Sequence, residues 1–370
     1  MGLVNASLGP TLPGLAVQTG SSLGALGVLI SARSLGYLVA LHPAGLGFDR
    51  RPGHAWLGVA LLCIAGGMAL TPGLPSVWAL LPIMLGVGAG EAVLDLAGNT
   101  LLAWAHGARA AAYLNALHFF YGVGALLAPL VVAASLTLGG GIAGAYWTLA
   151  ALLLPVALGV LATRPPAAPA RRAAAGAAAD ARADGLLVLL LAALLLLAVG
   201  AEVSLGGWWA SYALRVGLTD AAGAAVLTSL YWSGFAAGRL VGVALSTRWL
   251  PRRVLVLHLG IALLAVGAAA AWPWLAWAAA PVAGWGIGPL FATAVAFAGR
   301  RIPLSGRVTS RLFMGGALGG MTLPWLAGLL LARAGALALM LWIAALLALA
   351  LVVVWRVVSQ DGRRRPPLHA

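Results

Sequence analysis

The sequence predicts an all-α membrane protein, with about twelve transmembrane helices in two halves of six. Of its 370 residues, 62% are hydrophobic and only 8% are charged, whereas a soluble domain keeps about a quarter of its residues charged. Many apolar tracts are long enough to cross roughly 30 Å of hydrocarbon at about 1.5 Å of helix per residue. These tracts do not alternate polar with apolar residues, which favours helices over a closed barrel.

The first half is predicted to hold six spans. The first, at 2–17, is shorter than the rest, because Met1 falls where half a helix should already have passed. A misassigned start or a truncated N-terminus would explain that length. The other five spans are expected at 23–46, 55–70, 77–104, 114–136 and 144–162.

A segment rich in Pro, Ala and Arg at 163–185 separates the two halves and is expected to be a linker. The organisation is therefore a first bundle at 1–162, the linker, a second bundle at 186–358 and a basic tail at 359–370. In the second bundle, spans are expected at 186–205, 222–245, 254–271, 274–298, 308–331 and 337–358.

Arginine sets the expected orientation. The formal net charge is +14, and the basic residues gather in every second connection, the linker and the tail. This is the positive-inside pattern, which places the linker and the C-terminus in the cytoplasm of a multi-pass cell (inner) membrane protein. The excess of basic over acidic residues is therefore attributed to membrane topology and not to nucleic-acid binding.

The two halves carry weakly similar patterns about 200 residues apart. Gly36-Tyr-Leu-Val and Gly238-Arg-Leu-Val stand at the same distance before an arginine. Glycines repeat with a spacing of two in the fourth and tenth spans, and a Gly–Pro pair recurs in the fifth and eleventh. The shared order indicates two parallel repeats of six helices.

The fourth span holds Glu91, Asp95 and Asn99 on one helix face, because they are spaced at i, i+4 and i+8. Charges in a bilayer cost several kcal/mol unless they are paired or hydrated, so this face is expected to look into the bundle. Two carboxylates one turn apart repel when both are ionised, so one is expected to carry a proton near neutral pH. The alternative is a neutral structural acid bonded to a neighbouring helix.

Asn99 and further polar side chains in the spans are candidate substrate contacts. Asn115 and His118 share one side of the fifth span, and Glu202 is an acid in the seventh. Each can hydrogen-bond a polar solute, although an intramembrane His is often only structural. Trp232 lies well inside its span, where a cavity role and a packing role are both open, whereas Trp208 and Trp209 are expected in an interfacial belt.

Arg33 lies deep in the second span and needs an acidic partner, for which Asp95 and Glu91 are both candidates. Arg239 is expected near the cytoplasmic end of its span, where it can snorkel or anchor a gate.

The segment 45–53, which contains Asp49, Arg50 and Arg51, resembles the loop signature of the major facilitator superfamily, with one extra residue between Arg50 and Gly53. This resemblance implies a gating role for Asp49 and Arg50, which would join Arg239 at the cytoplasmic gate. The alternative is a turn with a few basic anchors. The stretches 86–99, 113–125, 199–208 and 238–242 look like helices four, five, seven and eight of the fucose permease group, the fucose–galactose–glucose:proton symporters.

By that resemblance Asp95 matches the carboxylate that gains and loses the proton. Two positions depart from the group's pattern. Gly9 stands where the fucose permease has a coupling acid, and Glu202 stands where it has an amide. The missing acid at Gly9 leaves the sugar specificity and the coupling stoichiometry open, and Glu202 is expected either to bind substrate hydroxyls or to titrate.

The main hypothesis is a proton-coupled symporter of a sugar or similar small polar solute that works by alternating access, as a monomer and without a cofactor. The alternative is proton-driven efflux of drugs or metabolites on the same fold. A membrane enzyme or receptor is the third reading, but the sequence offers neither metal-spaced histidines nor a nucleophile with a base.

Overall fold

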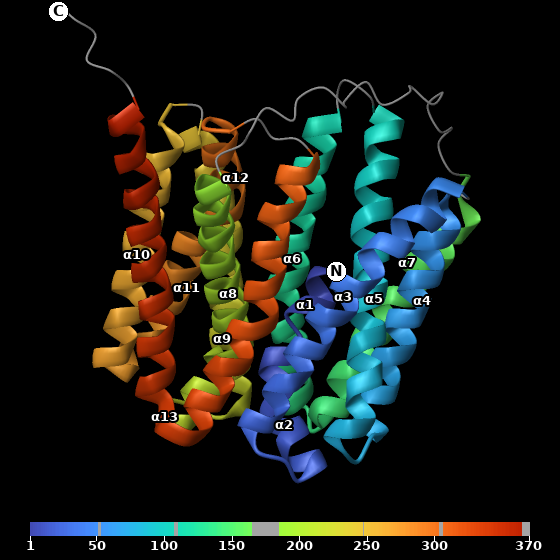
Figure 1. Cartoon of the computed structure of the whole chain (residues 1–370). Helices are drawn as coiled ribbons and strands as arrows, with labels where there is room; N and C mark the ends of the chain where they lie inside the picture. Colours follow the sequence, from blue (N-terminus) through green and yellow to red (C-terminus); the bar gives the residue numbers. More distant parts are fainter. Residues whose placement is uncertain (51–52, 107–109, 165–184, 247, 303–305, 365–370) are drawn as a thin grey trace, which may run out of the picture.

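The computed structural model describes residues 1–50, 53–106, 110–164, 185–246, 248–302 and 306–364. Within these ranges every regular element is helical, which confirms the predicted all-α class (Figure 1). The helices run lengthwise through the molecule, as expected of a bundle that crosses a bilayer.

In the first half, the shortened first span is two pieces, α1 (Gly2–Asn5) and α2 (Leu8–Thr19), separated at Ala6 and Ser7. The later spans lie close to their predicted positions. They are α3 (Leu23–Arg50), α4 (His54–Leu70), α5 (Val77–His106), α6 (Ala110–Thr137) and α7 (Gly141–Ala162), with a short 3-10 turn η1 (Thr71–Gly73) after α4.

The second half begins with α8 (Gly185–Arg215), α9 (Ala221–Ser246), α10 (Pro251–Ala271) and the 3-10 turn η3 (Pro273–Leu275). The tenth predicted span is divided into α11 (Ala276–Ile287) and α12 (Leu290–Gly299), because Pro289 has no backbone N–H to continue the helix. The last element, α13 (Gly306–Arg364), contains a non-helical Gly335 with φ 87°, which separates the two predicted final spans.

Nine stretches in the described ranges are long and apolar enough to cross a membrane. One of them, Arg311–Ser359, contains the break at Gly335. The short α2 and the less apolar α9, which carries several Gly and Ser residues and Arg239, are not among the nine. The total of twelve spans therefore stays a prediction.

Glycines allow close helix contact at matching places in the two halves. A side chain at Gly36 in α3 would overlap the carbonyl oxygen of Leu85 in α5, and one at Gly238 in α9 would overlap that of Trp285 in α11. Helices approach this closely only where no Cβ intervenes. The repeated pattern in the sequence thus corresponds to a repeated helix packing.

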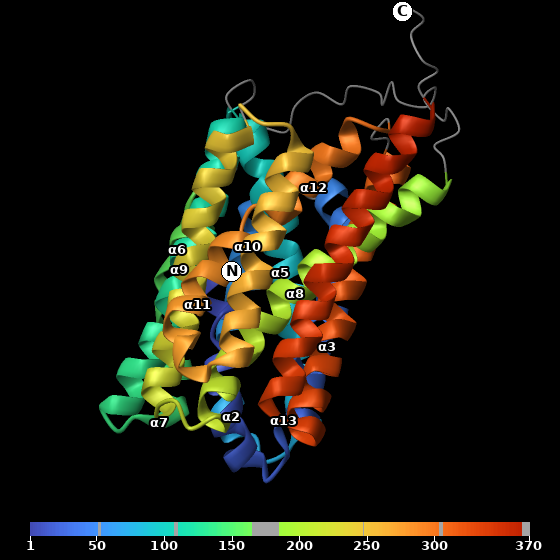
Figure 2. The same ribbon diagram turned by 90° about the vertical axis from the view of Figure 1, so that its left-hand side faces the viewer.

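The two halves meet through α3 and α13 on one side and α6 and α9 on the other (Figures 1 and 2). Hydrogen bonds to backbone carbonyls cross both seams. Ser31 Oγ donates to Met321 O at 2.7 Å, and Ser229 Oγ donates to Leu126 O at 2.7 Å. The halves are therefore held together by few polar contacts, alongside apolar packing.

A tryptophan closes one end of the contact between the halves. Trp208 is fully buried, and its indole nitrogen donates to Pro324 O at 2.8 Å. Its ring packs beside Gly27 of α3 and Gly328 of α13. The expected interfacial position of Trp208 and of the equally buried Trp209 is therefore wrong, because small residues on neighbouring helices leave room for indole rings inside the bundle.

Candidate functional site

A cavity of about 1740 Å³ lies between the two halves. Its wall includes residues of α1, α3, α5 and α6 on one side and of α8, α9, α12 and α13 on the other. It extends to Gly45, His54, Ala105 and Val160, at the end of the bundle where the predicted basic segments attach. At the opposite end, around Trp208, the helices are packed together.

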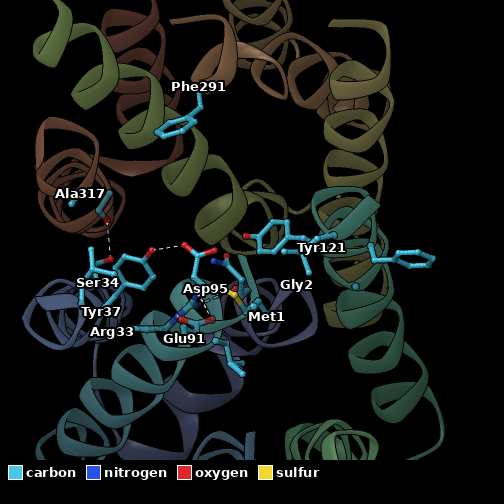
Figure 3. Close-up of a pocket in the computed structure, with 18 of the residues that line it drawn as sticks. Met1, Gly2, Arg33, Ser34, Tyr37, Glu91, Asp95, Tyr121, Phe291 and Ala317 are labelled. Carbon is cyan, nitrogen blue, oxygen red and sulfur yellow. Dashed lines mark hydrogen bonds and ion pairs between the residues drawn. The ribbon is translucent and has the colours of Figure 1, made fainter. Parts of the chain in front are cut away.

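An ion pair joins α3 to α5 at the deep end of this cavity. Arg33 Nε donates to Glu91 Oε2 at 2.7 Å, and Arg33 Nη2 donates to Glu91 Oε1 at 3.2 Å (Figure 3). A third bond runs from Arg33 Nη1 to the carbonyl oxygen of Asn5 at 3.2 Å. The side chains are only 12% and 4% exposed. The prediction that Arg33 needs an acidic partner is confirmed, and the partner is Glu91.

Asp95 lies one turn further along α5 and accepts a hydrogen bond on each carboxylate oxygen. Tyr37 Oη donates to Oδ2 at 2.7 Å (Figure 3), and Asn99 Nδ2 donates to Oδ1 at 2.8 Å. The same Asn99 amide also donates to the backbone oxygen of Asp95 at 2.7 Å. Asn99 therefore supports Asp95 and is not part of the cavity wall, whereas Glu91 and Asp95 both line it.

Two groups of opposite charge stand on the wall that the second half contributes. Glu202 of α8 lines the cavity, and its carboxylate accepts no hydrogen bond from any residue whose side chain is described. Tyr231 donates to its backbone oxygen only, at 3.1 Å. Arg239 of α9 also lines the cavity, and its Nε donates to Gly288 O at 3.1 Å. Its Cζ atom lies 4.9 Å from the centroid of the Phe235 ring.

The remaining predicted site residues fall elsewhere. Trp232 is 2% exposed, packs edge-on against Tyr231 and Phe235 and does not line the cavity. Its indole fills the space beside Gly206, so packing replaces the substrate contact that was considered for it. The side chains of Asn115, His118, Asp49 and Arg50 lie outside the described part of the structure.

Three further residues of the cavity wall are not predicted from the sequence. They are Tyr37 and the aromatic pair Phe291 and Phe313, whose ring centroids are 5.4 Å apart. A signal for Tyr37 was present, since it follows Arg33 by four residues and therefore shares its helix face. In the repeated pattern Tyr37 also occupies the position of Arg239. No comparable spacing identifies the two phenylalanines.

This arrangement offers hydrogen-bond donors and acceptors to a polar solute in the cavity. On the wall of the first half, the charged side chains bind one another or neighbouring helices. On the wall of the second half, the Glu202 carboxylate and the Nη groups of Arg239 make no hydrogen bond to a described side chain. Within the described ranges, no group of three or more His, Cys, Asp or Glu side chains could hold a metal ion.

Comparisons with known proteins agree with this geometry. The family described as Major Facilitator Superfamily matches residues 1–275. "Sodium-dependent glucose transporter 1" of Danio rerio is 34% identical over 131 residues, which cover 35% of this chain and 22% of that protein. "Sodium-dependent glucose transporter 1A" of Mus musculus is 25% identical over 369 residues, covering 89% of this chain and 87% of that protein.

Solved structures of transporters share the fold. A mutant of the nucleoside transporter NupG superposes with a TM-score of 0.79 at 12% identity, covering 97% of this chain and 96% of that chain. A mutant of the fucose:proton symporter FucP of E. coli superposes with a TM-score of 0.60 at 19% identity, with 96% of each chain covered. At these identities the likeness concerns the fold alone.

Proposed function

Since this chain belongs to the major facilitator superfamily and its matched relatives are transporters and not enzymes, we propose that it moves a sugar or a similar small polar solute across the membrane by alternating access. The observation that carries the proposal is the cavity between the halves, with Glu91, Asp95 and Glu202 in its wall. Acids at that depth are costly unless they serve a pathway or are paired.

The shape of the cavity supports alternating access. It extends to one end of the bundle, while the other end is closed around Trp208 by contacts of α3 and α8 with α13. Under the positive-inside orientation the open end is cytoplasmic, as are the linker and the C-terminus. Rocking the halves 1–162 and 186–358 against each other would open the other end, with Asp49, Arg50 and Arg239 near the cytoplasmic gate.

The substrate is proposed to dock mainly on the wall of the second half. The Glu202 carboxylate can accept bonds from sugar hydroxyls, and the Arg239 guanidinium can donate to hydroxyl or ring oxygens. Asn115 and His118 are proposed contacts from the first half. Aromatic rings at Phe291 and Phe313 offer apolar surface to the C–H face of a sugar. The names of the matched relatives, with glucose, fucose and nucleoside among their substrates, support this class of solute.

We propose the proton as the coupling ion, exchanged at Asp95 with Glu91 as its neighbour. The glucose transporters among the relatives are named sodium-dependent, which makes Na⁺ the competing ion. Proteoliposomes loaded at neutral pH separate the two. Uptake of labelled D-glucose, L-fucose and uridine is measured with an inward proton gradient, with an inward Na⁺ gradient, and with neither.

We expect the proton gradient, and not the Na⁺ gradient, to accelerate solute uptake. The double variant Asp95→Asn with Glu91→Gln should lose this acceleration, and unchanged gradient-driven uptake by this variant would refute the coupling role. Acceleration by Na⁺ alone would transfer the proposal to sodium symport. No uptake of any of the three solutes would reject the substrate class.

The alternative direction is proton-driven efflux, and the apolar part of the wall, with Phe120, Phe291, Phe313 and Met314, would suit an amphiphilic solute. An outside-acid gradient drives solute into cells in the symport reading and out of them in the efflux reading. The sign of accumulation in intact cells at pH 6 outside therefore decides between the two.

A further inference from the structure

Tyr37 has one hydroxyl proton, and in this structure that proton is committed to Asp95. The bond from Tyr37 Oη to Asp95 Oδ2 measures 2.7 Å, and Asn99 occupies the other carboxylate oxygen. An ionised carboxylate can only accept hydrogen bonds, on both of its oxygens. While Asp95 is ionised, Tyr37 can therefore offer its oxygen, but not its proton, to a solute in the cavity.

We propose that Tyr37 is a hydrogen-bond switch that links protonation of Asp95 to substrate binding. When Asp95 takes a proton from cavity water on Oδ2, its new O–H donates to Tyr37 Oη. The Tyr37 hydroxyl hydrogen must then turn away from Asp95 and can donate to an oxygen of a solute in the cavity. The proton is delivered by a hydronium ion of the cavity water. One O–H bond of that ion breaks as the O–H bond of Asp95 forms, and a neutral water molecule is left.

Tyr37 is well placed for this role. It lines the cavity, and Figure 3 shows its hydroxyl directed at the carboxylate of Asp95. The adjacent Gly36 fixes α3 against the backbone of α5, so the spacing of the two side chains is set by helix packing. Both residues belong to the first half, so the switch stays intact when the halves move relative to each other.

Other ionisable groups line the same cavity as Asp95. Among the described side chains they are the Met1 amino group at α1, Arg33 from α3, His54 from α4, Glu91 on α5 itself, Tyr121 from α6, Glu202 from α8 and Arg239 from α9. Among them, Glu91 accepts hydrogen bonds from the Nε and Nη2 groups of Arg33, one on each carboxylate oxygen. Tyr121 makes no hydrogen bond to a described side chain. No hydrogen-bonded carboxyl group is therefore present whose protonation would turn the Tyr121 hydroxyl hydrogen to a new direction.

The switch rests on the proposed function in one respect, since it assumes a solute with oxygen acceptors. It predicts that the protonated transporter binds such a solute more tightly. One additional hydrogen bond corresponds to about a three- to tenfold change in Kd.

A first experiment needs no solute. Infrared difference spectra of the purified protein between high and low pH should contain a protonated-carboxyl band that disappears in Asp95→Asn. In Tyr37→Phe this band should move to higher wavenumber, because the Asp95 O–H has lost its acceptor. The proposal is overturned if the band keeps its position in Tyr37→Phe, or if no Asp95 band appears at any pH at which the protein stays folded.

A second experiment measures the Kd of D-glucose by calorimetry at pH 5.5 and pH 8. The wild type should bind about three- to tenfold more tightly at the lower pH, and Tyr37→Phe should lose this ratio. Tyr121→Phe is the matched control: it removes the same hydroxyl from the same cavity and should keep the ratio. An unchanged ratio in Tyr37→Phe would reject the switch. If the wild type binds no glucose, glucose is not the substrate, and the infrared result alone decides on the switch.

Discussion

Arg33 and Glu91 form a two-pronged ion pair that bridges α3 and α5 inside one half of the molecule, with contacts of 2.7 and 3.2 Å. The pair also binds the backbone of Asn5 through Arg33, so it ties three helices of the first half together. Its strength depends on the low exposure of both side chains, since burial weakens the competition from water.

Removing one partner should be more harmful than removing both. Glu91→Ala leaves the Arg33 charge buried and unpaired, which should cost about 3–5 kcal/mol of stability. The double variant Arg33→Met with Glu91→Met replaces the pair by apolar groups and should recover most of that loss. The stability of each variant is measured as the midpoint temperature of thermal unfolding in detergent. A double variant as unstable as Glu91→Ala would contradict this prediction.

Glu202 is predicted to bind the substrate directly. Glu202→Gln keeps the shape of the side chain but removes its charge, so the Kd for D-glucose should rise about tenfold, or roughly 1.4 kcal/mol. Trp232→Phe is the comparison, because Trp232 packs in the core and does not line the cavity. This variant should lower the melting temperature and leave the Kd unchanged. The reverse pattern would place the binding site at Trp232.

The contact between α3 and α5 should be sensitive to a single methyl group. A Cβ at Gly36 overlaps the Leu85 carbonyl oxygen, whereas a Cβ at Gly86, on the facing helix, meets nothing within 4 Å. Gly36→Ala should therefore destabilise the protein by about 1–3 kcal/mol. Gly86→Ala should be neutral or slightly stabilising, since alanine favours the helix. Equal melting temperatures for the two variants would show that the helices do not approach this closely.

The closed end can be tested by cross-linking. A Cβ at Gly24 of α3 would lie 2.8 Å from the Cβ of Ala332 in α13, near the range that a disulfide spans. In a background with the native Cys63 replaced by Ala, the pair Gly24→Cys and Ala332→Cys should cross-link under mild oxidation. Uptake should stop with the cross-link and return after reduction, while each single cysteine variant stays active. Full activity of the oxidised pair would show that this end need not open.

Local spacing made part of the site predictable from the sequence. Glu91, Asp95 and Asn99 follow one another at helical intervals, so their common face could be read without knowing any neighbour. The partner of Arg33 could not be decided, because Asp95 and Glu91 differ by one turn and the choice depends on how far α3 slides along α5. The structure places Glu91 opposite the guanidinium and Tyr37 opposite Asp95.

The tryptophans show a second limit. A membrane helix is apolar on most sides, so its sequence does not say which face meets lipid and which meets protein. Trp208 and Trp232 lie inward because glycines on neighbouring helices make room for their rings. Those glycines stand on other segments of the chain, so the pairing of each indole with its space requires the three-dimensional arrangement.

The ion pair between Arg33 and Glu91 has an electrical consequence. When the first half moves in a membrane under voltage, these two residues travel together as a neutral dipole, so the potential does almost no work on them. An unpaired charge crossing the full field would exchange about 2.3 kcal/mol per 100 mV. The voltage dependence of an empty carrier would then be set by Asp95, Glu202 and Arg239, and occupancy of Asp95 by a proton would change the charge that moves by one unit.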